Sequence, residues 1–491
     1  MTQAELAGRG LRLAPNSRSC EGLRMEAEAG WTLGFVRDAA GARLLRGDPG
    51  LRVAGVCTDS RQVRQGDLFV ALRGPRFDGH EFVSAAVDGG AVAVLVEAGR
   101  GGEVPAGCAV LEVEDTRAAL ARWAVVHRAG FGGRVIAVAG SNGKTSTKEL
   151  LGSVLGRGGP VVASAASFNN ELGVPLTLLR LGGRHWAAVV EVGTNHPGEL
   201  GRLLSWVQPD CGVLTGVGRE HLEFFGDLAG VAAEEGTLAE VLPAGGVLVL
   251  SGDDTWAGAI AARTRARVVR VGFEEGNDWR AREVRLDWRG TRFWVEGPED
   301  GWSGAYEIRL LGRHQVRNAL LAVALARELG LGVEQVRAGL AGCRPAPHRM
   351  ESFEAGGVRV LDDAYNANPD SMRAALETFC ALPCAGRRVA VLGEMAELGS
   401  ASERAHAEAG RWAAELGVQQ LLAVGPWAGV MAGAAREAGL TRVLVFGGVE
   451  PVWGALRQLL RPGDALLLKA SRRAGLERLA EWWRSEMGDA A

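Results

Sequence analysis

Short apolar runs rich in β-branched residues recur along the chain, separated by helical or turn-rich stretches. One series occupies 135–138, 187–192, 212–215, 246–250 and 268–271. A second series occupies 358–361, 388–392, 421–424, 442–446 and 465–468. Alternation of strand and helix over such lengths predicts largely parallel sheets flanked by helices. We therefore predict an α/β chain with a central domain at 113–344 and a C-terminal domain at 345–491.

The remaining patterns complete this division. Runs at 53–56, 67–72 and 91–96, with a helical stretch at 81–88, predict a smaller first domain at 25–112. Residues 1–24 show no apolar period, and we expect a disordered leader there. The short alternating runs of 277–308 predict an antiparallel excursion at the edge of the central sheet. An alanine-rich helix is expected from 312, with His314 and Asn318 four residues apart on one face.

The predicted strand at 135–138 leads into a glycine turn, Gly-Ser-Asn-Gly-Lys-Thr at 140–145, and then a helix. A turn of this kind points backbone N–H groups and a helix N-terminus at one spot, which favours phosphate. Lys144 is placed to reach the outer phosphates, and the Thr145 hydroxyl to contact Mg²⁺. Gly140 and Gly143 enclose only two residues, fewer than the usual phosphate loop has.

The use of lysine supports this interpretation. Of 55 basic residues only Lys144, Lys148 and Lys469 are lysines, so arginine serves wherever a generic positive charge is sufficient. Lysine differs from arginine in its compact charge and flexible stem. Two of the three lysines lie in the candidate loop and its helix, which indicates a chemical requirement there.

Composition excludes several classes of protein. The formal net charge of −3 in 491 residues indicates no nucleic-acid footprint. No apolar run reaches the length of about 18 residues that a membrane helix needs. The seven cysteines show no disulfide spacing and no metal-binding pattern. A reduced cytoplasmic enzyme is the class that remains.

Polar motifs follow the predicted strands. Glu191 ends one strand, and His221 follows the next, beside the glycine turn in a parallel sheet. A carboxylate and a histidine there suit a divalent metal, whereas each alone is typical of an ordinary surface residue. In the first domain, Ser60 and Arg61 can hold a nucleotide diphosphate, or simply form a turn between strands.

These motifs resemble those of the Mur ligase family from about residue 53 to the C-terminus. The resemblance rests on the motifs at 140–145, 169–175, 362–371 and 469–472. It implies three domains, the central one similar to P-loop ATPases. It also implies an ATP- and Mg²⁺-dependent ligase that joins D-alanyl-D-alanine to UDP-N-acetylmuramoyl-tripeptide through an acyl phosphate. Such ligases are commonly cytoplasmic monomers without nucleic-acid partners or membrane spans.

The resemblance also implies residue roles. Lys144, Glu191, His221, Glu235 and Arg349 would be catalytic. The nucleotide would contact Gly140, Ser141, Asn142, Gly143, Lys144, Thr145 and Ser146, with His314 and Asn318 at the adenine, Asp363 at the ribose and Arg349 at the γ-phosphate. Thr145 and Glu191 would hold one Mg²⁺, and His221 and Glu235 a second. Ser60 and Arg61 would bind the uridine diphosphate, and the other substrate contacts would be Asn169, Asn170, Asn366, Asn368, Asp370, Ser371, Lys469, Ser471 and Arg472.

Three positions depart from the family pattern. The family typically has, fourteen residues after its metal histidine, a lysine whose carbamate helps to hold the second Mg²⁺, and Glu235 stands there instead. We hypothesise that Glu235 supplies the carboxylate directly, which would make the enzyme independent of bicarbonate. The alternative is a solvated helix glutamate and a weaker metal site. Gly216 replaces an asparagine and His348 replaces a glycine before Arg349.

Two other functions compete with this one. A sister ligase would add a different amino acid or dipeptide. A catalytically inactive nucleotide-binding homologue is the second alternative, for which the absent lysine at position 235 is the main argument.

Overall fold

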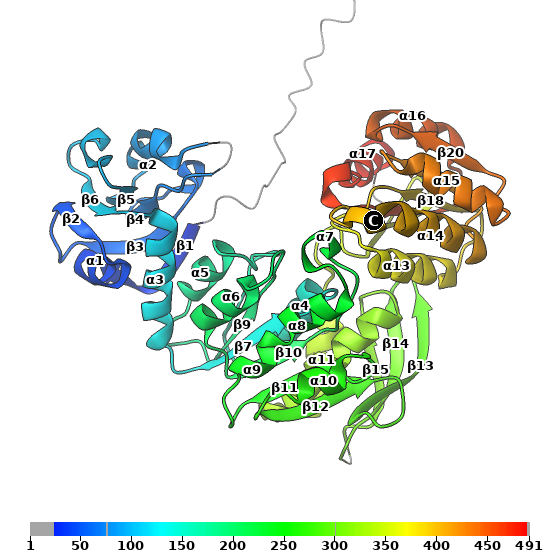
Figure 1. Cartoon of the computed structure of the whole chain (residues 1–491), viewed down its shortest axis with the longest axis horizontal. Coiled ribbons are helices and arrows are strands. Elements are labelled where there is room, and N and C mark those ends of the chain that lie inside the picture. The colour runs from blue at the N-terminus through cyan, green and yellow to red at the C-terminus, as the bar shows by residue number, and fades with distance from the viewer. Residues whose placement is uncertain (1–23, 75–76, 300, 489–491) are drawn as a thin grey trace, which may run out of the picture. The chain divides into compact units, whose positions relative to one another are not determined.

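The computed structural model describes residues 24–74, 77–299 and 301–488 (Figure 1). The predicted leader at 1–24 lies outside these residues except for Arg24, where the first strand begins. The chain divides into two compact units, one ending at Val126 and the other starting at His127. Within the described residues, every helix is too short or too polar to span a bilayer.

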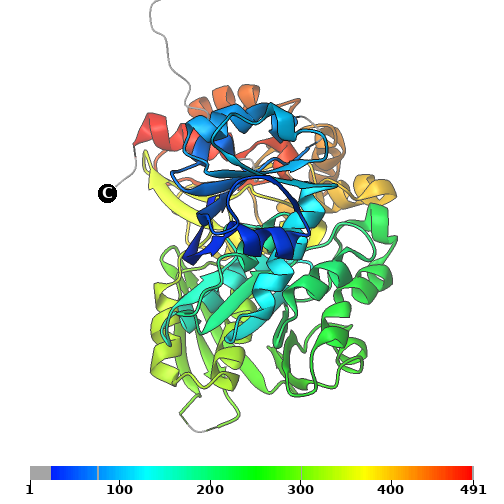
Figure 2. The same ribbon diagram turned by 90° about the vertical axis from the view of Figure 1, so that its left-hand side faces the viewer.

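The first unit contains a six-stranded sheet in the order β1-β3-β4-β5-β6-β2, which faces the viewer in Figure 2. Its strands are β1 (Arg24–Thr32), β2 (Arg43–Arg46), β3 (Arg52–Cys57), β4 (Asp67–Val70), β5 (Ala93–Glu97) and β6 (Ala109–Val113), with helices α1 (Leu33–Ala40) and α2 (Val83–Asp88). The inner strands β3 to β6 are parallel, and β1 and β2 are antiparallel edges. The three predicted strands are confirmed as β3, β4 and β5. Strands β1, β2 and β6 were not predicted. The edge strand β2 has no fully buried position and therefore no apolar signal, whereas β6 is buried throughout.

The second unit begins with the end of α3 (Thr116–Ala129) and contains a nine-stranded sheet in the order β15-β14-β13-β12-β11-β10-β7-β9-β8. Its strands are β7 (Arg134–Ala139), β8 (Val161–Ala163), β9 (Ala187–Glu191), β10 (Cys211–Leu214), β11 (Val247–Ser251), β12 (Arg267–Gly272), β13 (Trp279–Asp287), β14 (Gly290–Glu296) and β15 (Gly304–Ile308). Strands β7 to β12 are parallel, and β13 to β15 form an antiparallel extension, as predicted.

Helices cover this central sheet. The long helices α4 (Lys144–Leu155), α11 (Arg313–Glu328) and α12 (Val333–Gly342) pack against one another, and α11 is buried along most of its length. Helices α6 (Glu199–Val207) and α9 (Thr237–Val241) contact β7 and β10. The shorter helices are α5 (Gly173–Leu178), α7 (Leu222–Phe225), α8 (Leu228–Glu235) and α10 (Ala257–Ala261). This packing fixes α11 beside the start of α4, where the glycine turn lies.

The second unit also contains a six-stranded sheet in the order β16-β17-β21-β18-β19-β20. Its strands are β16 (Glu351–Ala355), β17 (Val358–Asp363), β18 (Arg388–Leu392), β19 (Gln420–Val424), β20 (Val443–Phe446) and β21 (Ala465–Lys469). The flanking helices are α13 (Pro369–Ala381), α14 (Ser402–Glu415), α15 (Ala428–Glu437), α16 (Val449–Leu459) and α17 (Glu477–Met487). One apolar cluster lies under α13 to α15 and a second under α16 and α17. Helices therefore cover both faces of a largely parallel sheet, as predicted.

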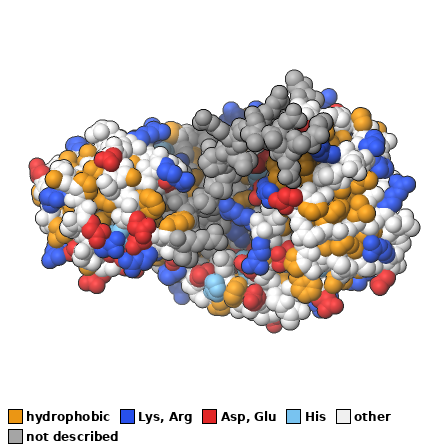
Figure 3. Space-filling view, turned by 90° about the horizontal axis from the view of Figure 1, so that it is seen from above, with side chains coloured by type: hydrophobic (Ala, Val, Ile, Leu, Met, Phe, Trp, Pro, Cys, Tyr) orange, Lys and Arg blue, Asp and Glu red, His pale blue; other side chains and the backbone are white. Residues whose placement is uncertain are grey.

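Charged side chains of both signs are interspersed on the face seen in Figure 3. This agrees with 55 basic and 58 acidic residues in the sequence.

Candidate active site

The glycine turn joins β7 to α4 and requires glycine at both ends. Gly140 and Gly143 have φ of +113° and +89°, in the left-handed region that other residues rarely adopt. A Cβ atom at Gly140 would lie 2.4 Å from Thr215 Oγ1, and one at Gly143 would lie 2.6 Å from Asn318 Oδ1. The turn is therefore closely packed against Thr215 at one end and Asn318 at the other.

Lys144 lies at the start of α4, surrounded by carboxylates. Its ammonium donates to Gly140 O at 2.5 Å and lies 3.7 Å from Glu220 Oε2. Burial lowers the pKa of Lys144, but the carboxylates of Glu220, Glu235 and Glu191 outweigh this effect and raise it above its usual value. The side chain is therefore a permanent cation, as phosphate binding requires.

Thr145 and Glu191 form a pair at the adjacent ends of α4 and β9. Thr145 Oγ1 lies 3.2 Å from Glu191 Oε1, and Asn169 Nδ2 donates to the same oxygen at 2.9 Å. The other carboxylate oxygen, Glu191 Oε2, is buried without a hydrogen-bond partner among the described residues. An unpaired buried carboxylate oxygen is unfavourable in water-free surroundings, and a hard cation compensates it. Hydroxyl and carboxylate oxygens are ligands that Mg²⁺ prefers, so these residues fit the metal that the sequence predicts.

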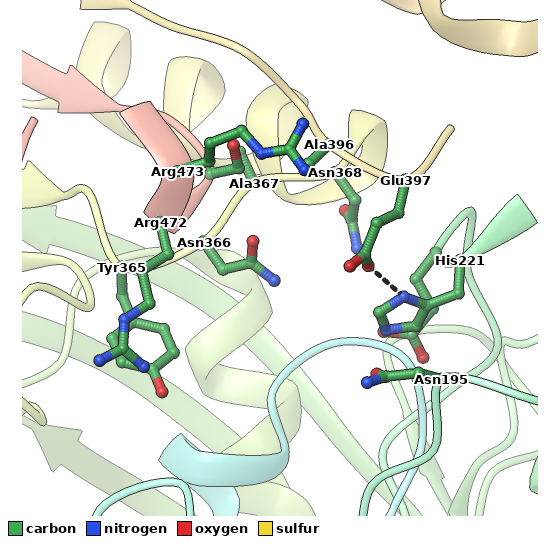
Figure 4. A pocket seen from close by; sticks show the side chains of 12 residues that line it. Asn195, His221, Tyr365, Asn366, Ala367, Asn368, Ala396, Glu397, Arg472 and Arg473 are labelled. Carbon is green, nitrogen blue, oxygen red and sulfur yellow. Dashed lines mark ion pairs between the residues drawn. The ribbon is translucent and has the colours of Figure 1, made fainter. Parts of the chain in front are cut away.

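His221 follows β10 and lies between two carboxylates. Its backbone has a φ of +49°, and its Nδ1 is 2.6 Å from Glu397 Oε2 (Figure 4). Its Nε2 is 4.0 Å from Glu220 Oε2. The contact with His221 lowers the pKa of Glu397 below its usual value, so Glu397 is an anion. One ring nitrogen therefore lies beside the Glu397 carboxylate, and the other faces Glu220.

Glu235 lies at the end of α8, and its side chain points toward the glycine turn. It is 1% exposed, and its Oε2 accepts a hydrogen bond from Gly140 N at 2.7 Å. Burial, together with the nearby Glu220, raises its pKa to about 8. Its neighbour Glu234 has a separate role, because it accepts from Gly198 N and Leu200 N at the start of α6. The alternative of a solvated glutamate at position 235 is therefore wrong.

Arg349 is held in a strained turn next to the third sheet. The residues on either side of it, His348 and Met350, have φ of +57° and +54°. His348 Nδ1 lies 2.7 Å from the buried Asp362 Oδ2, which fixes this turn. The Arg349 guanidinium stacks over Tyr365 at 4.0 Å. Backbone strain of this kind persists only where surrounding contacts determine it.

The residues His348, Glu351 and Asp362 also lie close enough together to hold an ion. The carboxylate oxygens that would bind such an ion already have protein partners, however. Both oxygens of Asp362 are engaged, by His348 Nδ1 and Ala364 N, and Glu351 pairs with Arg484. This group supports the Arg349 turn.

A cleft of about 260 Å³ opens beside His221 (Figure 4). It combines carboxylates with guanidinium groups and amides, and its polar lining is Asn195, Glu220, His221, Tyr365, Asn366, Asn368, Glu397, Ser471, Arg472 and Arg473. The buried Ser471 Oγ has no hydrogen-bond partner among the described residues. Such a lining suits a ligand that carries charges of both signs.

Comparison with known proteins agrees with this geometry. Family models match at 52–128 (Mur ligase family, catalytic domain), 138–326 (Mur ligase middle domain) and 348–472 (Mur ligase, glutamate ligase domain). The UDP-N-acetylmuramoyl-tripeptide–D-alanyl-D-alanine ligase of Escherichia coli K12 is 37% identical over 402 residues, covering 80% of this chain and 86% of that protein. The chain belongs to the Mur ligase family.

Other relatives of this Mur ligase extend the comparison. The Mycobacterium bovis ligase of the same name is 40% identical over 475 residues, covering 88% of this chain and 92% of that protein. A crystal structure of MurF from Acinetobacter baumannii has a TM-score of 0.82 at 32% identity, covering 93% and 99% of the two chains. MurF from Thermotoga maritima in complex with ADP has a TM-score of 0.76 at 28% identity, covering 88% and 97%.

Several predicted nucleotide residues of this Mur ligase lie around the glycine turn. His314 and Asn318 share one side of α11, and Asn318 Nδ2 donates to Gln315 Oε1 at 3.0 Å. Gln315 in turn contacts Ser146 Oγ at 3.4 Å. Asp363 is farther along the chain, where its Oδ2 lies 2.6 Å from Lys469 Nζ and its Oδ1 accepts from Met350 N.

The predicted substrate residues of α13 have structural contacts. Asn368 and Ser371 form a reciprocal cap at the start of this helix. Asn368 Nδ2 also donates to Asn142 Oδ1 of the glycine turn at 2.9 Å. Both Asp370 oxygens accept from Arg219, through its Nε and its backbone N. These contacts connect the third sheet to the glycine turn and to the loop after β10.

The other predicted substrate residues fall into three places. Asn366, Ser471 and Arg472 line the cleft, and the Lys469 ammonium donates to Asn366 O at 2.6 Å. Asn170 Oδ1 accepts from Leu172 N and Gly173 N at the start of α5. Ser60 and Arg61 lie in the first unit, and Arg61 forms an ion pair with Asp59 at 2.7 Å.

Sequence reasoning missed Glu220, Glu397 and Arg219. Glu220 and Arg219 immediately precede His221, and Glu397 follows the strand β18. Their positions after parallel strands were the available signal. Their pairing with residues far along the chain was not visible in the sequence.

Proposed function

We propose that this Mur ligase joins D-alanyl-D-alanine to UDP-N-acetylmuramoyl-tripeptide with ATP and Mg²⁺, in the synthesis of peptidoglycan precursor. The match to ligases of that name over 80–88% of the chain supports the substrates. The observation that carries the chemistry is the Thr145–Glu191 pair with its unpaired buried oxygen, next to a glycine turn and Lys144.

The reaction takes two steps. The terminal carboxylate of the tripeptide attacks the γ-phosphorus of ATP, and ADP leaves. The amine of D-alanyl-D-alanine then attacks the acyl carbon, loses a proton and expels phosphate, so that one amide forms for each ATP. Little covalent chemistry is required of the protein, whose contribution is positioning and charge neutralisation.

Contacts support some of the residue roles in this proposal. Lys144 would hold the phosphates, because its ammonium lies at the glycine turn where α4 begins. Thr145 and Glu191 would hold one Mg²⁺, and His221 and Glu235 would hold a second. A bound Mg²⁺ neutralises charge on the transferred phosphoryl group. Arg349 is held by Tyr365 and Ser167, with its Nη2 donating to Ser167 Oγ at 2.9 Å, ready to contact the γ-phosphate.

The remaining assignments complete the proposal. His314 and Asn318 contact the adenine, Asp363 the ribose, and Ser60 and Arg61 the uridine diphosphate. The cleft beside His221 receives the peptide ends. Domain boundaries at 25–112, 113–344 and 345–491, a monomeric state and a cytoplasmic location stay predictions.

Phosphate release from ATP tests the function. The full chain with Mg²⁺ should release phosphate only when UDP-N-acetylmuramoyl-tripeptide and D-alanyl-D-alanine are both present. Lys144→Met should abolish this release. Turnover with a free amino acid in place of the dipeptide would instead indicate a sister ligase, and nucleotide binding without turnover would indicate an inactive homologue.

A separate test addresses Glu235. Glu235→Ala and the isosteric Glu235→Gln should each reduce turnover at least about a hundredfold, because a removed metal ligand leaves transition-state charge unneutralised. Removal of bicarbonate should leave wild-type turnover unchanged. Near-normal turnover and Mg²⁺ dependence in both variants would exclude the metal role.

A further inference from the structure

Glu220 is a buried carboxylate to which no role has so far been given. It is 8% exposed and lies in the loop between β10 and α7. Its Oε2 is 3.7 Å from Lys144 Nζ and 4.0 Å from His221 Nε2. One oxygen thus lies between the phosphate-loop lysine and the histidine, at the wall of the cleft.

The orientation of His221 leaves one nitrogen for this side. Its Nδ1 lies against Glu397, which is an arrangement typical of metal-bound histidines, where a carboxylate fixes the ring. The free nitrogen is therefore Nε2, the atom that faces Glu220. The left-handed backbone of His221 adds strain that a purely structural histidine does not need.

The separation between the two atoms matches a shared ion. Mg²⁺ binds oxygen at about 2.1 Å, so two ligands on opposite sides of one ion lie about 4.2 Å apart. The observed 4.0 Å between Glu220 Oε2 and His221 Nε2 is close to this value.

The surrounding charges also favour a cation. The carboxyl groups of Glu191, Glu220 and Glu235 all lie around Lys144, and together they offer more oxygen ligands than this one ammonium can satisfy. Glu191 Oε2 is buried and unpaired, which shows independently that the carboxylates are not satisfied by protein groups alone.

We propose that Glu220 is a direct ligand, together with His221, of a divalent cation, and that this site takes up the ion before the nucleotide binds. The inference rests on the proposed metal role of His221. Because the ion competes with Lys144 for the same carboxylate oxygen, its arrival releases the lysine to contact phosphate. The other interpretation of Glu220 is a counter-ion of Lys144 only.

Mn²⁺ binding to the full chain without nucleotide distinguishes a metal ligand at Glu220 from a counter-ion of Lys144 only. Titration followed by electron paramagnetic resonance should show an ion coupled to a histidine nitrogen, and His221→Gln should remove that coupling. Glu220→Gln should weaken the histidine-coupled ion at least about tenfold, as loss of a metal-site carboxylate does. The matched control is Glu223→Gln, an exposed position three residues away, which should bind Mn²⁺ like the wild type.

Two outcomes would overturn the proposal. One is wild-type protein without a histidine-coupled Mn²⁺, and the other is Glu220→Gln with unchanged affinity for it. If Glu220→Gln fails to fold, Glu220→Asp takes its place, because it keeps the negative charge but shortens the side chain, and unchanged affinity for the histidine-coupled ion there counts against the proposal in the same way.

This experiment is independent of the ligase assay. A histidine-coupled ion in a protein that releases no phosphate with the two substrates would leave the site standing and refute the proposed reaction. Ligase activity in a protein without a histidine-coupled ion would support the proposed reaction and refute the metal site at Glu220.

Discussion

His314 is expected to make the stability of the second unit sensitive to acid. Burial, followed by the nearby charges of Arg317 and Lys469, lowers its pKa from 6.5 to about 3. Folded protein therefore keeps a neutral imidazole at pH values where the unfolded chain is protonated. The unfolded state binds more protons in this range, so stability decreases as the pH falls below about 6.5.

The size of the effect follows from the two pKa values. Linkage between a folded pKa of about 3 and an unfolded value of 6.5 gives a loss of about 2 kcal/mol between pH 7 and pH 5. This is an upper bound, because His314 is only partly shielded from solvent. His314→Gln cannot take up the proton, so its stability should not show this loss.

Urea unfolding of both proteins between pH 5 and pH 7 measures the difference. The fluorescence of the 14 tryptophans follows unfolding, and Trp279, buried in the central core beside α11, contributes to this signal. Subtracting the variant from the wild type cancels titration elsewhere. Curves that run parallel to within about 0.5 kcal/mol across this range would refute the assigned burial and charge of His314.

Two further substitutions test the turn geometry. Gly143→Ala places a Cβ 2.6 Å from Asn318 Oδ1 at a left-handed φ, and should weaken ADP binding in calorimetry at least about tenfold, since the left-handed backbone alone costs about 1–2 kcal/mol. Gly152→Ala in the same helix meets its nearest atom at 3.5 Å and should bind normally; equal affinities would contradict the packing. The hydrogen bond with Asp362 raises the pKa of His348. The His348–Asp362 pair therefore contributes its full stabilisation of the fold below about pH 6.5, and this contribution is lost as the pH rises through the raised pKa. Asparagine at position 348 keeps a hydrogen-bond donor and tolerates a positive φ, so the melting temperature of His348→Asn should lack this pH dependence. His348→Ala should melt several degrees lower than the wild type at every pH. If His348→Asn kept the pH dependence of the wild type, the His348–Asp362 pairing would be refuted.

Most of the strands that the sequence predicted are buried. All ten strands predicted for the two sheets of the second unit are present, and most of them read as unbroken apolar runs because they are covered on both faces. Strands β2, β8 and β16 lie at sheet edges and were missed, because partial exposure removes this signal. The edge strand β1 was also missed, and so was β6, although every residue of β6 is buried.

The site was predictable in its residue types but not in its pairings. Gly140, Gly143, Lys144 and Thr145 follow one another, so local sequence was sufficient to place them together. Glu235 contacts Gly140 across 95 residues, and only the fold shows that its side chain is buried. Asn368 and Ser371 were predicted as substrate contacts, but a helix cap uses the same residue types at the same spacing.

The scarcity of lysine has a practical consequence for amine chemistry. The side chains of Lys144, Lys148 and Lys469 are 14%, 0% and 2% exposed, so no lysine of this chain is freely accessible in the folded state. Acylating reagents that modify surface amines in most proteins will therefore react slowly here. Their rate at Lys144 becomes a direct measure of how often the glycine turn opens, and of which ligands close it.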